Sequence, residues 1–310
     1  MESENKMKKI LDYILHPEKG IVYLNNNTFL GKIFSDEFYL KNLYKLRAGK
    51  KLDLSHPTEL NAKFQWYKLK YRNPLMTKCA DKVRVREYVK ECGFAYLLNE
   101  QYVVCDSVED INFNKLPDVF YIKCNHSFGA NMLIKKSELT NEKKIELKEY
   151  FEKALNKNYY IQNREWAYKD ISPQIICERY LKSETPLVDL NFFCFNGKFK
   201  MLYYNIGLAD DLGRHSVGHR AILDQNLNII DNAYTQMERL VREKVSLPSN
   251  IQELINCAET LSKPFPHARV DFFITSEGTY FGEITFYSAS GFMYLKPDEL
   301  YDELGKCFVI

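Results

Sequence analysis

The 310-residue sequence lacks an apolar run near the roughly 18 residues that a membrane span needs, and it carries almost no net charge. Its 43 Lys and Arg residues against 41 Asp and Glu leave +2, which disfavours a nucleic-acid binder that uses a basic surface. A composition of 45% apolar and 27% charged residues excludes disordered and collagen-like chains. The N-terminal stretch lacks the apolar core of a signal peptide, so we expect a cytoplasmic protein.

The eight cysteines include no Cys-x-x-Cys pair, a spacing typical of zinc and redox sites. Because the chain shows no export signal, they are predicted to be free thiols rather than disulfides. Cys177 and Cys194 lie inside apolar runs, where cysteine packs as a small hydrophobic side chain. No base accompanies a cysteine in a pattern that indicates a catalytic thiol.

The spacing of apolar residues divides the chain into three regions. Residues 1–80 are predicted to be a helical N-terminal region, because apolar residues recur at helical spacing in 36–51 and 58–72. Residues 81–180 begin with a helix that ends at Gly93 and continue with short apolar runs and one amphipathic helix within 138–160. The predicted strands are 95–98, 102–105, 119–124, 131–136 and 174–181. The predicted buried stripe of the amphipathic helix is Ile145, Leu147, Tyr150, Phe151 and Leu155.

Residues 181–310 contain the strongest hairpin signal of the chain, the Asn196-Gly197 turn between two apolar runs. A second hairpin is predicted to turn at residues 276–278, and helices are predicted near 248–265 and 297–308. Helices combined with antiparallel hairpins indicate an α+β fold.

Lys123 ends an apolar strand and precedes a small, polar, glycine-containing loop. Backbone amides of such a loop can approach phosphate oxygens, and a lysine on a strand supplies a fixed positive charge. An ordinary hairpin turn would have the same pattern, so that alternative stays open.

Acidic residues stand on both strands of the second hairpin. Asp271 follows Arg269 by two residues, and Glu283 on the partner strand shares a face with Thr285 by the period-2 rule. Two carboxylates among apolar residues repel each other unless a cation lies between them. Mg²⁺ prefers such oxygen ligands together with nucleotide phosphates, so the hairpin is a candidate magnesium site. A surface hairpin whose acids face solvent is the alternative.

The predicted strand 174–181 ends in a charged segment that follows its apolar residues. Glu178 precedes Leu181, and further acids stand at Glu184 and Asp189. A segment that crosses between two lobes can offer backbone donors and acceptors to a base, and carboxylates to an amine and to ribose hydroxyls. A strand exit without function is the alternative.

Taken in this order, the three patterns resemble the ATP-grasp superfamily. Asp81-Lys82 to Arg86 resembles its first phosphate-lysine segment, and residues 122–131 resemble the second lysine with its flexible loop. Residues 177–181 are similar to the adenine hinge of D-alanine–D-alanine ligase, and 269–273 with 282–286 are similar to its magnesium strands. Residues 56–93 resemble the TupA-like branch, named for teichuronopeptide biosynthesis. The resemblance covers about residues 30–295.

The resemblance implies an ATP-grasp fold in which two α+β lobes clasp ATP. Residues 81–180 would be the lysine and lid lobe and 181–310 the metal-binding lobe, with 1–80 as a helical extension. An ADP-forming ligase that activates a carboxylate with ATP and joins it to an amine is implied. The implied nucleotide contacts are Lys82, Lys123, the loop from Ser127 to Asn131, Glu178, the Leu181 backbone, and Glu184 or Asp189. The implied Mg²⁺ contacts are Asp271, Glu283 and Thr285, with Arg269 at the transferred phosphoryl group.

The sequence departs from the family pattern on the side of the second substrate. Thr285 replaces the usual asparagine of the last metal motif, where a hydroxyl is a weaker ligand. Ala62 and Asn191 replace a glutamate and a basic residue. In the segment 212–220, Arg214 and Arg220 are candidates to anchor an acidic substrate or an acyl phosphate; a solvated basic loop is the alternative.

The TupA-like branch is associated with bacterial surface polysaccharides. The implied substrates are a sugar carboxylate, such as a uronic acid, and an amino acid or other amine. Two further interpretations stay open: a glycosyltransferase that uses a nucleotide sugar, with Asp210-Asp211 as the nearest metal motif, and a nucleotide-binding module without catalysis. Phosphate release from ATP that requires both a carboxylate and an amine separates the three.

Overall fold

The computed structural model describes residues 12–127, 129–183, 186–207, 218–236, 239–242 and 244–310. Within them, no helix combines the length and apolar character of a membrane span. The helices are α2 (Pro17–Asn27), α3 (Asp36–Ala48), α4 (Leu60–Lys70), α5 (Pro74–Ala80), α6 (Val85–Glu91), α7 (Asn141–Leu155), α8 (Tyr159–Asn163), α9 (Ile251–Ser262) and α10 (Asp298–Cys307).

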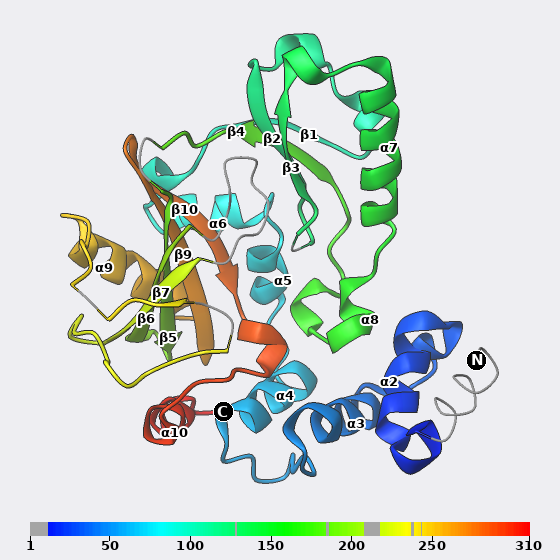
Figure 1. Cartoon of the computed structure of the whole chain (residues 1–310), viewed down its shortest axis with the longest axis vertical. Helices are drawn as coiled ribbons and strands as arrows, with labels where there is room; N and C mark the ends of the chain where they lie inside the picture. The colour runs from blue at the N-terminus through cyan, green and yellow to red at the C-terminus, as the bar shows by residue number, and fades with distance from the viewer. Residues whose placement is uncertain (1–11, 128, 184–185, 208–217, 237–238, 243) are drawn as a thin grey trace.

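The helices predicted in the N-terminal region are confirmed, and local capping defines α3. The Ser35 hydroxyl accepts a hydrogen bond from the Phe38 amide at the start of α3, and Gly49 ends it with a φ of 70°. Helix α4 packs against α10, so the C-terminal helix lies beside the N-terminal helical region along the lower edge of the molecule (Figure 1).

The smaller lobe contains a four-stranded antiparallel sheet in the order β1-β4-β2-β3. Its strands are β1 (Gln101–Cys105), β2 (Val119–Cys124), β3 (Asn131–Lys135) and β4 (Ile175–Arg179). Helix α7 covers one face of this sheet, and Leu147 and Phe151 bury its contact side (Figure 1). This lobe therefore has a hydrophobic core of its own.

The larger lobe contains a six-stranded sheet in the order β10-β9-β5-β6-β7-β8. Its strands are β5 (Val188–Phe195), β6 (Lys198–Ile206), β7 (His219–Asp224), β8 (Arg239–Leu240), β9 (His267–Thr275) and β10 (Gly278–Thr285). The β5–β6 turn has Asn196 at φ 50° and Gly197 at φ 72°, as a two-residue hairpin with two left-handed positions requires. Both predicted hairpins are confirmed.

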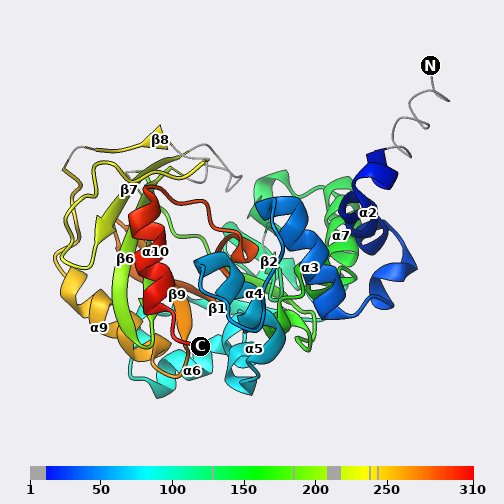
Figure 2. The same ribbon diagram turned by 90° about the horizontal axis from the view of Figure 1, so that it is seen from below.

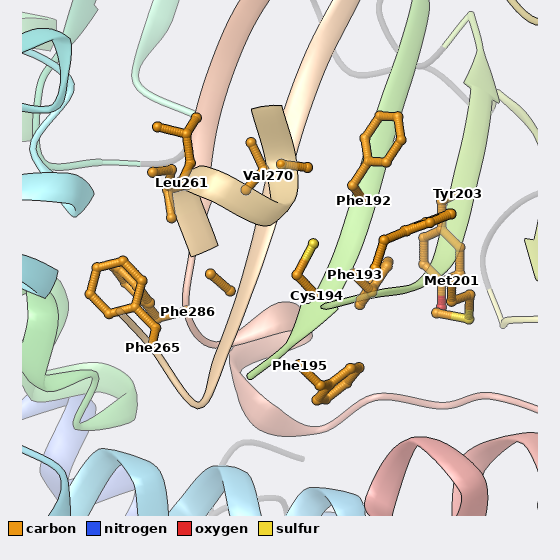
Figure 3. Close-up of a cluster of buried hydrophobic side chains, with 14 of the residues drawn as sticks. Phe192, Phe193, Cys194, Phe195, Met201, Tyr203, Leu261, Phe265, Val270 and Phe286 are labelled. Atoms are coloured by element: carbon orange, nitrogen blue, oxygen red, sulfur yellow. The ribbon is translucent and has the colours of Figure 1, made fainter. Parts of the chain in front are cut away.

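Aromatic side chains dominate the core of the larger lobe. Phe192, Phe193 and Phe195 lie on β5, with Met201 and Tyr203 on the neighbouring strand β6 (Figure 3). Helix α9 packs on β5, β6 and β9 from one side, and α10 lies along the sheet when the molecule is viewed from below (Figure 2).

The structure overturns two local predictions and confirms a third. Residues 95–97 form a 3₁₀ turn instead of a strand, because a short apolar run does not distinguish a strand from a buried turn of helix. On α7, Ile145 is 59% and Tyr150 40% exposed, so the buried stripe is narrower than predicted. All eight cysteines are free thiols, as predicted.

Candidate functional site

Lys82 lies in the short segment between α5 and α6 and contacts both lobes. Its ammonium donates to the Ser127 carbonyl oxygen at 2.8 Å, beyond the end of β2. The same ammonium lies 3.4 Å from a carboxylate oxygen of Glu283 on β10. One positive charge therefore stands where the two sheets approach each other.

Asn125 fixes the segment that carries Lys82. This buried side chain donates to the Asp81 carboxylate at 3.0 Å and accepts from the Gln174 amide at 2.7 Å. The Lys82 amide in turn donates to the Asn125 carbonyl oxygen at 3.1 Å. Sequence reasoning missed this residue; the available signal was a polar side chain next to the end of an apolar strand, which is costly to bury without partners.

Lys123 and Glu178 form an ion pair between neighbouring strands of the smaller lobe. Tyr121 on β2 is the register partner of Glu178 on β4, so Lys123 is its diagonal neighbour on the same face. The Lys123 Nζ and Glu178 Oε1 atoms are 2.5 Å apart, and each side chain is about one-fifth exposed. The pair forms part of the wall of a small cavity.

This cavity lies between the two lobes. Its volume of about 40 Å³ holds on the order of one or two water molecules. Cations, one carboxylate and apolar side chains of both lobes line it: Lys82, Val85, Arg86, Asn99, Lys123, Glu178, Leu181, Phe273, Phe281 and Gly282. Lys82, Lys123, Glu178 and Leu181, which the sequence nominated together, thus line one space.

Asp271, Glu283 and Thr285 lie around the guanidinium of Arg269. Arg269 donates to Asp271 Oδ1 at 2.8 Å and to the Thr285 hydroxyl at 3.2 Å. Thr285 donates to Glu283 Oε1 at 3.1 Å, and the Arg269 guanidinium is 3.7 Å from that carboxylate. The pairing of β9 with β10 is irregular between Phe281 and Ile284, and such a bulge re-aims the side chain at its centre.

The three acids of this cluster, Asp271, Asp189 and Glu283, differ in their affinity for protons. Burial raises the pKa of Asp271 to about 6, although Arg269 opposes the shift. Burial, followed by the charge of Asp271, raises the pKa of Asp189 to about 8. For Glu283 burial acts in the same direction, but Lys82 and Arg269 outweigh it and lower the pKa. Additional positive charge would hold all three carboxylates ionised.

The oxygen atoms of this cluster suit a hard cation that has further ligands, such as water and phosphate, in its coordination shell. In the described part of the chain, no group of three or more His, Cys, Asp or Glu side chains gathers as a metal cage. Two carboxylates and a hydroxyl, from Asp271, Glu283 and Thr285, are the oxygen donors here. Mg²⁺ is commonly held by one or two carboxylates and completes its shell with water and phosphate.

A line of amides connects the acidic cluster to Arg220. Asn191 donates to Asp189 Oδ1 at 2.7 Å, and Asn205 donates to Asn191 Oδ1 at 2.8 Å. Arg220 on β7 donates to Asn205 Oδ1 at 2.6 Å and stacks on the Tyr203 ring at 4.1 Å from its centre. Asp189 therefore lies with the acids of β9 and β10 and does not line the small cavity. The expected Glu184 and Arg214 fall outside the described residues.

Comparison with known proteins gives a match over most of the chain. The family model described as TupA-like ATPgrasp matches residues 62–309. No curated protein is significantly similar to the chain.

Many solved structures are similar to the chain, and three of them show the low level of identity. The L-amino acid ligase of Bacillus licheniformis has 12% identity, covers 76% of this chain and 51% of its own, and gives a TM-score of 0.46. The D-alanine–D-alanine ligase of Bacillus anthracis has 19% identity, 67% and 57% coverage and a TM-score of 0.38. The Helicobacter pylori D-alanine–D-alanine ligase has 16% identity, 73% and 60% coverage and a TM-score of 0.39. The chain spans about half to three-fifths of the length of these proteins.

Proposed function

This chain belongs to the TupA-like ATP-grasp family, and from that premise we propose that it is an ADP-forming ligase that joins a carboxylate to an amine. One observation carries the proposal. Lys82 contacts both lobes and stands between the cavity at Lys123 and Glu178 and the acidic strands at Asp271 and Glu283. A pocket, cations suited to phosphates and a candidate metal site therefore follow each other in the order of the base, phosphates and metal of a bound nucleotide.

ATP is the first substrate in this proposal. Its adenine enters the space between Glu178 and the Leu181 backbone, and its phosphates meet Lys82 and Lys123. Because the cavity of about 40 Å³ is too small for a purine, binding requires that the lobes separate and that the Lys123–Glu178 pair opens. The loop from Ser127 to Asn131 then covers the phosphates and excludes water.

Asp271, Glu283 and Thr285 are assigned to Mg²⁺. When bound, the ion would neutralise phosphate charge during transfer. We assign Asp189 to this acidic cluster rather than to the ribose, since it is a diagonal neighbour of Asp271 in the sheet and the charge of Asp271 raises its pKa. The ribose role proposed for Glu184 is retained as a prediction.

The chemistry proceeds through an acyl phosphate. A carboxylate oxygen of the second substrate attacks the γ-phosphorus of ATP, and ADP leaves with the bridging oxygen. The amine nitrogen then attacks the acyl carbon, inorganic phosphate leaves, and the nitrogen loses a proton to give the amide. Arg269 steadies the transferred phosphoryl group, and Arg220 is assigned to the acidic substrate, as is Arg214.

The finer assignment concerns the substrates. Following the branch that the chain belongs to, we propose a uronic acid of a bacterial surface polysaccharide as the carboxylate and an amino acid or amino compound as the amine. We propose the cytoplasm as the site of the reaction, because ATP and sugar precursors are present there. The nucleotide-sugar transferase alternative depended on Asp210-Asp211, which lies outside the described residues.

Isotope transfer tests the reaction. Glucuronic acid labelled with ¹⁸O in its carboxyl group is incubated with the protein, ATP, Mg²⁺ and a mixture of amino acids. One labelled oxygen is expected in the released phosphate, with ADP as the nucleotide product. Release of AMP and pyrophosphate, or label that stays wholly in the product, contradicts the acyl-phosphate mechanism. Consumption of a nucleotide sugar in a parallel reaction, without ATP cleavage, supports the transferase instead.

A further inference from the structure

A second and larger cleft lies between the N-terminal helices and the segment that follows β10. Its volume of about 830 Å³ is in the range of pockets that bind small organic ligands. Polar and aromatic side chains of α3, α4, α10 and the 289–296 segment line it, and these elements adjoin along the lower edge in Figure 1. Neither the β9 and β10 acids nor Lys82 and Lys123 belong to its lining, so the cleft is separate from the nucleotide cavity.

Part of this cleft lies outside the region that matches the family model. Tyr44, Arg47, Lys50, Glu59 and Asn61 line it, and all five precede residue 62, where the match begins. The helices α3 and α4 and the segment between them thus build one wall of the cleft.

Among the described residues, no carboxylate forms an ion pair with Arg47 of the cleft, although its charge helps to lower the pKa of the buried Glu165. The other two cations that line it are paired, Lys50 with Glu59 at 2.6 Å and Lys296 with Asp298 at 2.6 Å. The guanidinium of Arg47 instead lies 4.8 Å from the centre of the Phe292 ring. Stacking orients the guanidinium and leaves its N–H groups available for a ligand carboxylate, which arginine can bind through two hydrogen bonds.

Aromatic rings form the rim of the cleft. Tyr294 lines it and stands 6.1 Å from Tyr234, measured between ring centres, and both side chains are 40% exposed. Tyr301 and Gln236 also face the space. Exposed rings beside amide and hydroxyl groups suit a ligand with apolar faces and a polar edge, which is the character of a sugar ring.

The remaining wall is held in a strained conformation. Ala289 and Ser290 have φ of 49° and 53°, a left-handed region that non-glycine residues rarely adopt. Two buried side chains of α4 hold this turn: Lys68 donates to the Ser290 carbonyl oxygen at 2.8 Å, and Gln65 donates to that of Gly291 at 2.7 Å. The turn presents Ala289 to the cleft in a defined position.

The cleft is within reach of the proposed magnesium strands. Ala289 is four residues after Thr285, so their Cα atoms are at most about 14 Å apart even along a fully extended chain. A ligand that fills the cleft and also reaches the acidic strands therefore extends over more than one binding subsite. A chain of sugars meets that requirement, whereas a single monosaccharide does not.

We infer that this cleft binds the remote part of an acidic oligosaccharide, a second uronic acid unit whose carboxylate pairs with Arg47 while the reacting unit lies at Asp271 and Glu283. This inference rests on the proposed ligase function and names its acceptor as a chain of at least two sugars. Remote contacts of this kind position the reacting group without taking part in the chemistry.

Direct binding to the full-length protein tests the inference. Trigalacturonic acid is titrated by calorimetry without ATP, beside galacturonic acid, uncharged maltotriose and triglutamate. The charged trimer is expected to bind at least tenfold more tightly than each of the other three. Arg47→Gln and Tyr294→Ala are each expected to weaken the trimer at least tenfold and to leave ATP affinity unchanged. Lys41→Gln removes a charge from the same helix outside the cleft and serves as the matched control.

Several results overturn the inference. These are equal binding of monomer and trimer, equal binding of maltotriose, preference for triglutamate, absence of trimer binding, and an Arg47→Gln variant that binds like the control. Because this titration contains no ATP, its result does not depend on whether the protein is a ligase. A protein that releases ADP with a carboxylate and an amine but does not bind the trimer keeps the proposed function and loses the oligosaccharide site.

Discussion

Replacing Asp271 by asparagine is expected to stabilise the folded protein while it removes ATP turnover. The carboxyl is 4% exposed, and its pKa is raised from 3.8 to about 6, chiefly by burial and against the attraction of Arg269. Because the folded state holds the proton more tightly than the unfolded chain, folding stability falls as pH rises from 3.8 to about 6, and the full cost is present above pH 6. Asparagine keeps the shape of the aspartate side chain and removes its ionisable group.

The expected gain in folding stability follows from the size of the pKa shift of Asp271. A difference of about 2.2 pH units between the unfolded and folded states corresponds to about 3 kcal/mol, which is an upper value because Asp189 titrates with Asp271. Urea denaturation should therefore give an advantage of about 1 kcal/mol for Asp271→Asn at pH 4.5 and up to about 3 kcal/mol at pH 7.5. The exposed Asp170→Asn substitution serves as the control with no such gain.

Nucleotide turnover supplies the other half of the test. ADP release with a carboxylate and an amine should be lost in Asp271→Asn, and Mg²⁺ with ATP should raise the unfolding temperature of the wild-type protein alone. A variant that is less stable than the wild type at pH 7.5 would refute the electrostatic reasoning. A stabilised variant with wild-type turnover would instead remove Asp271 from the proposed metal site.

Three further predictions concern the cations and their support. Lys123→Met should weaken ATP binding about ten- to a hundredfold in a titration, the range of charge-assisted hydrogen bonds; unchanged affinity would leave β2 and β3 an ordinary hairpin. Lys82→Met removes a charge that lowers the pKa of Glu283, so the acidic limb of a kcat/KM profile should move to higher pH; an unmoved limb contradicts that role. Asn125→Ala should cost about 1–3 kcal/mol in urea denaturation and raise the KM for ATP, since Asp81 and the Gln174 amide lose their partner; a KM that stays unchanged despite the lost stability would assign Asn125 to folding alone.

Elements whose signals are local could be predicted from the sequence. The Asn196-Gly197 turn needs only its own two left-handed residues, and the hairpin it makes is present. The predicted buried stripe of α7 is wider than the observed one, because only one side of that helix meets the sheet. Leu147 and Phe151, one turn apart, are buried there, whereas Ile145 and Tyr150 face outward.

The residues of the candidate site also fall into those that a local sequence pattern predicts and those that only the tertiary structure brings together. Glu283 and Thr285 could be placed on one face because strand periodicity decides it, and the hydrogen bond between them follows. The contact of Lys82 with Glu283 joins residues about two hundred positions apart, and only the packing of the lobes produces it. The amide line from Asp189 to Arg220 likewise crosses three strands, so no local pattern contained it.

The pairing of opposite charges in the site has a consequence for how ligands enter it. Lys82 contacts Glu283, Lys123 contacts Glu178, and Arg269 holds Asp271. Under the proposed function, ATP alone would bind the cations and leave the carboxylates without a positive partner. Mg²⁺ alone would bind the carboxylates and leave the cations without a negative partner. Arriving together, they exchange partners with every charge still compensated. The two ligands are therefore energetically coupled: each increases the affinity for the other by the same factor, and the empty site attracts neither strongly.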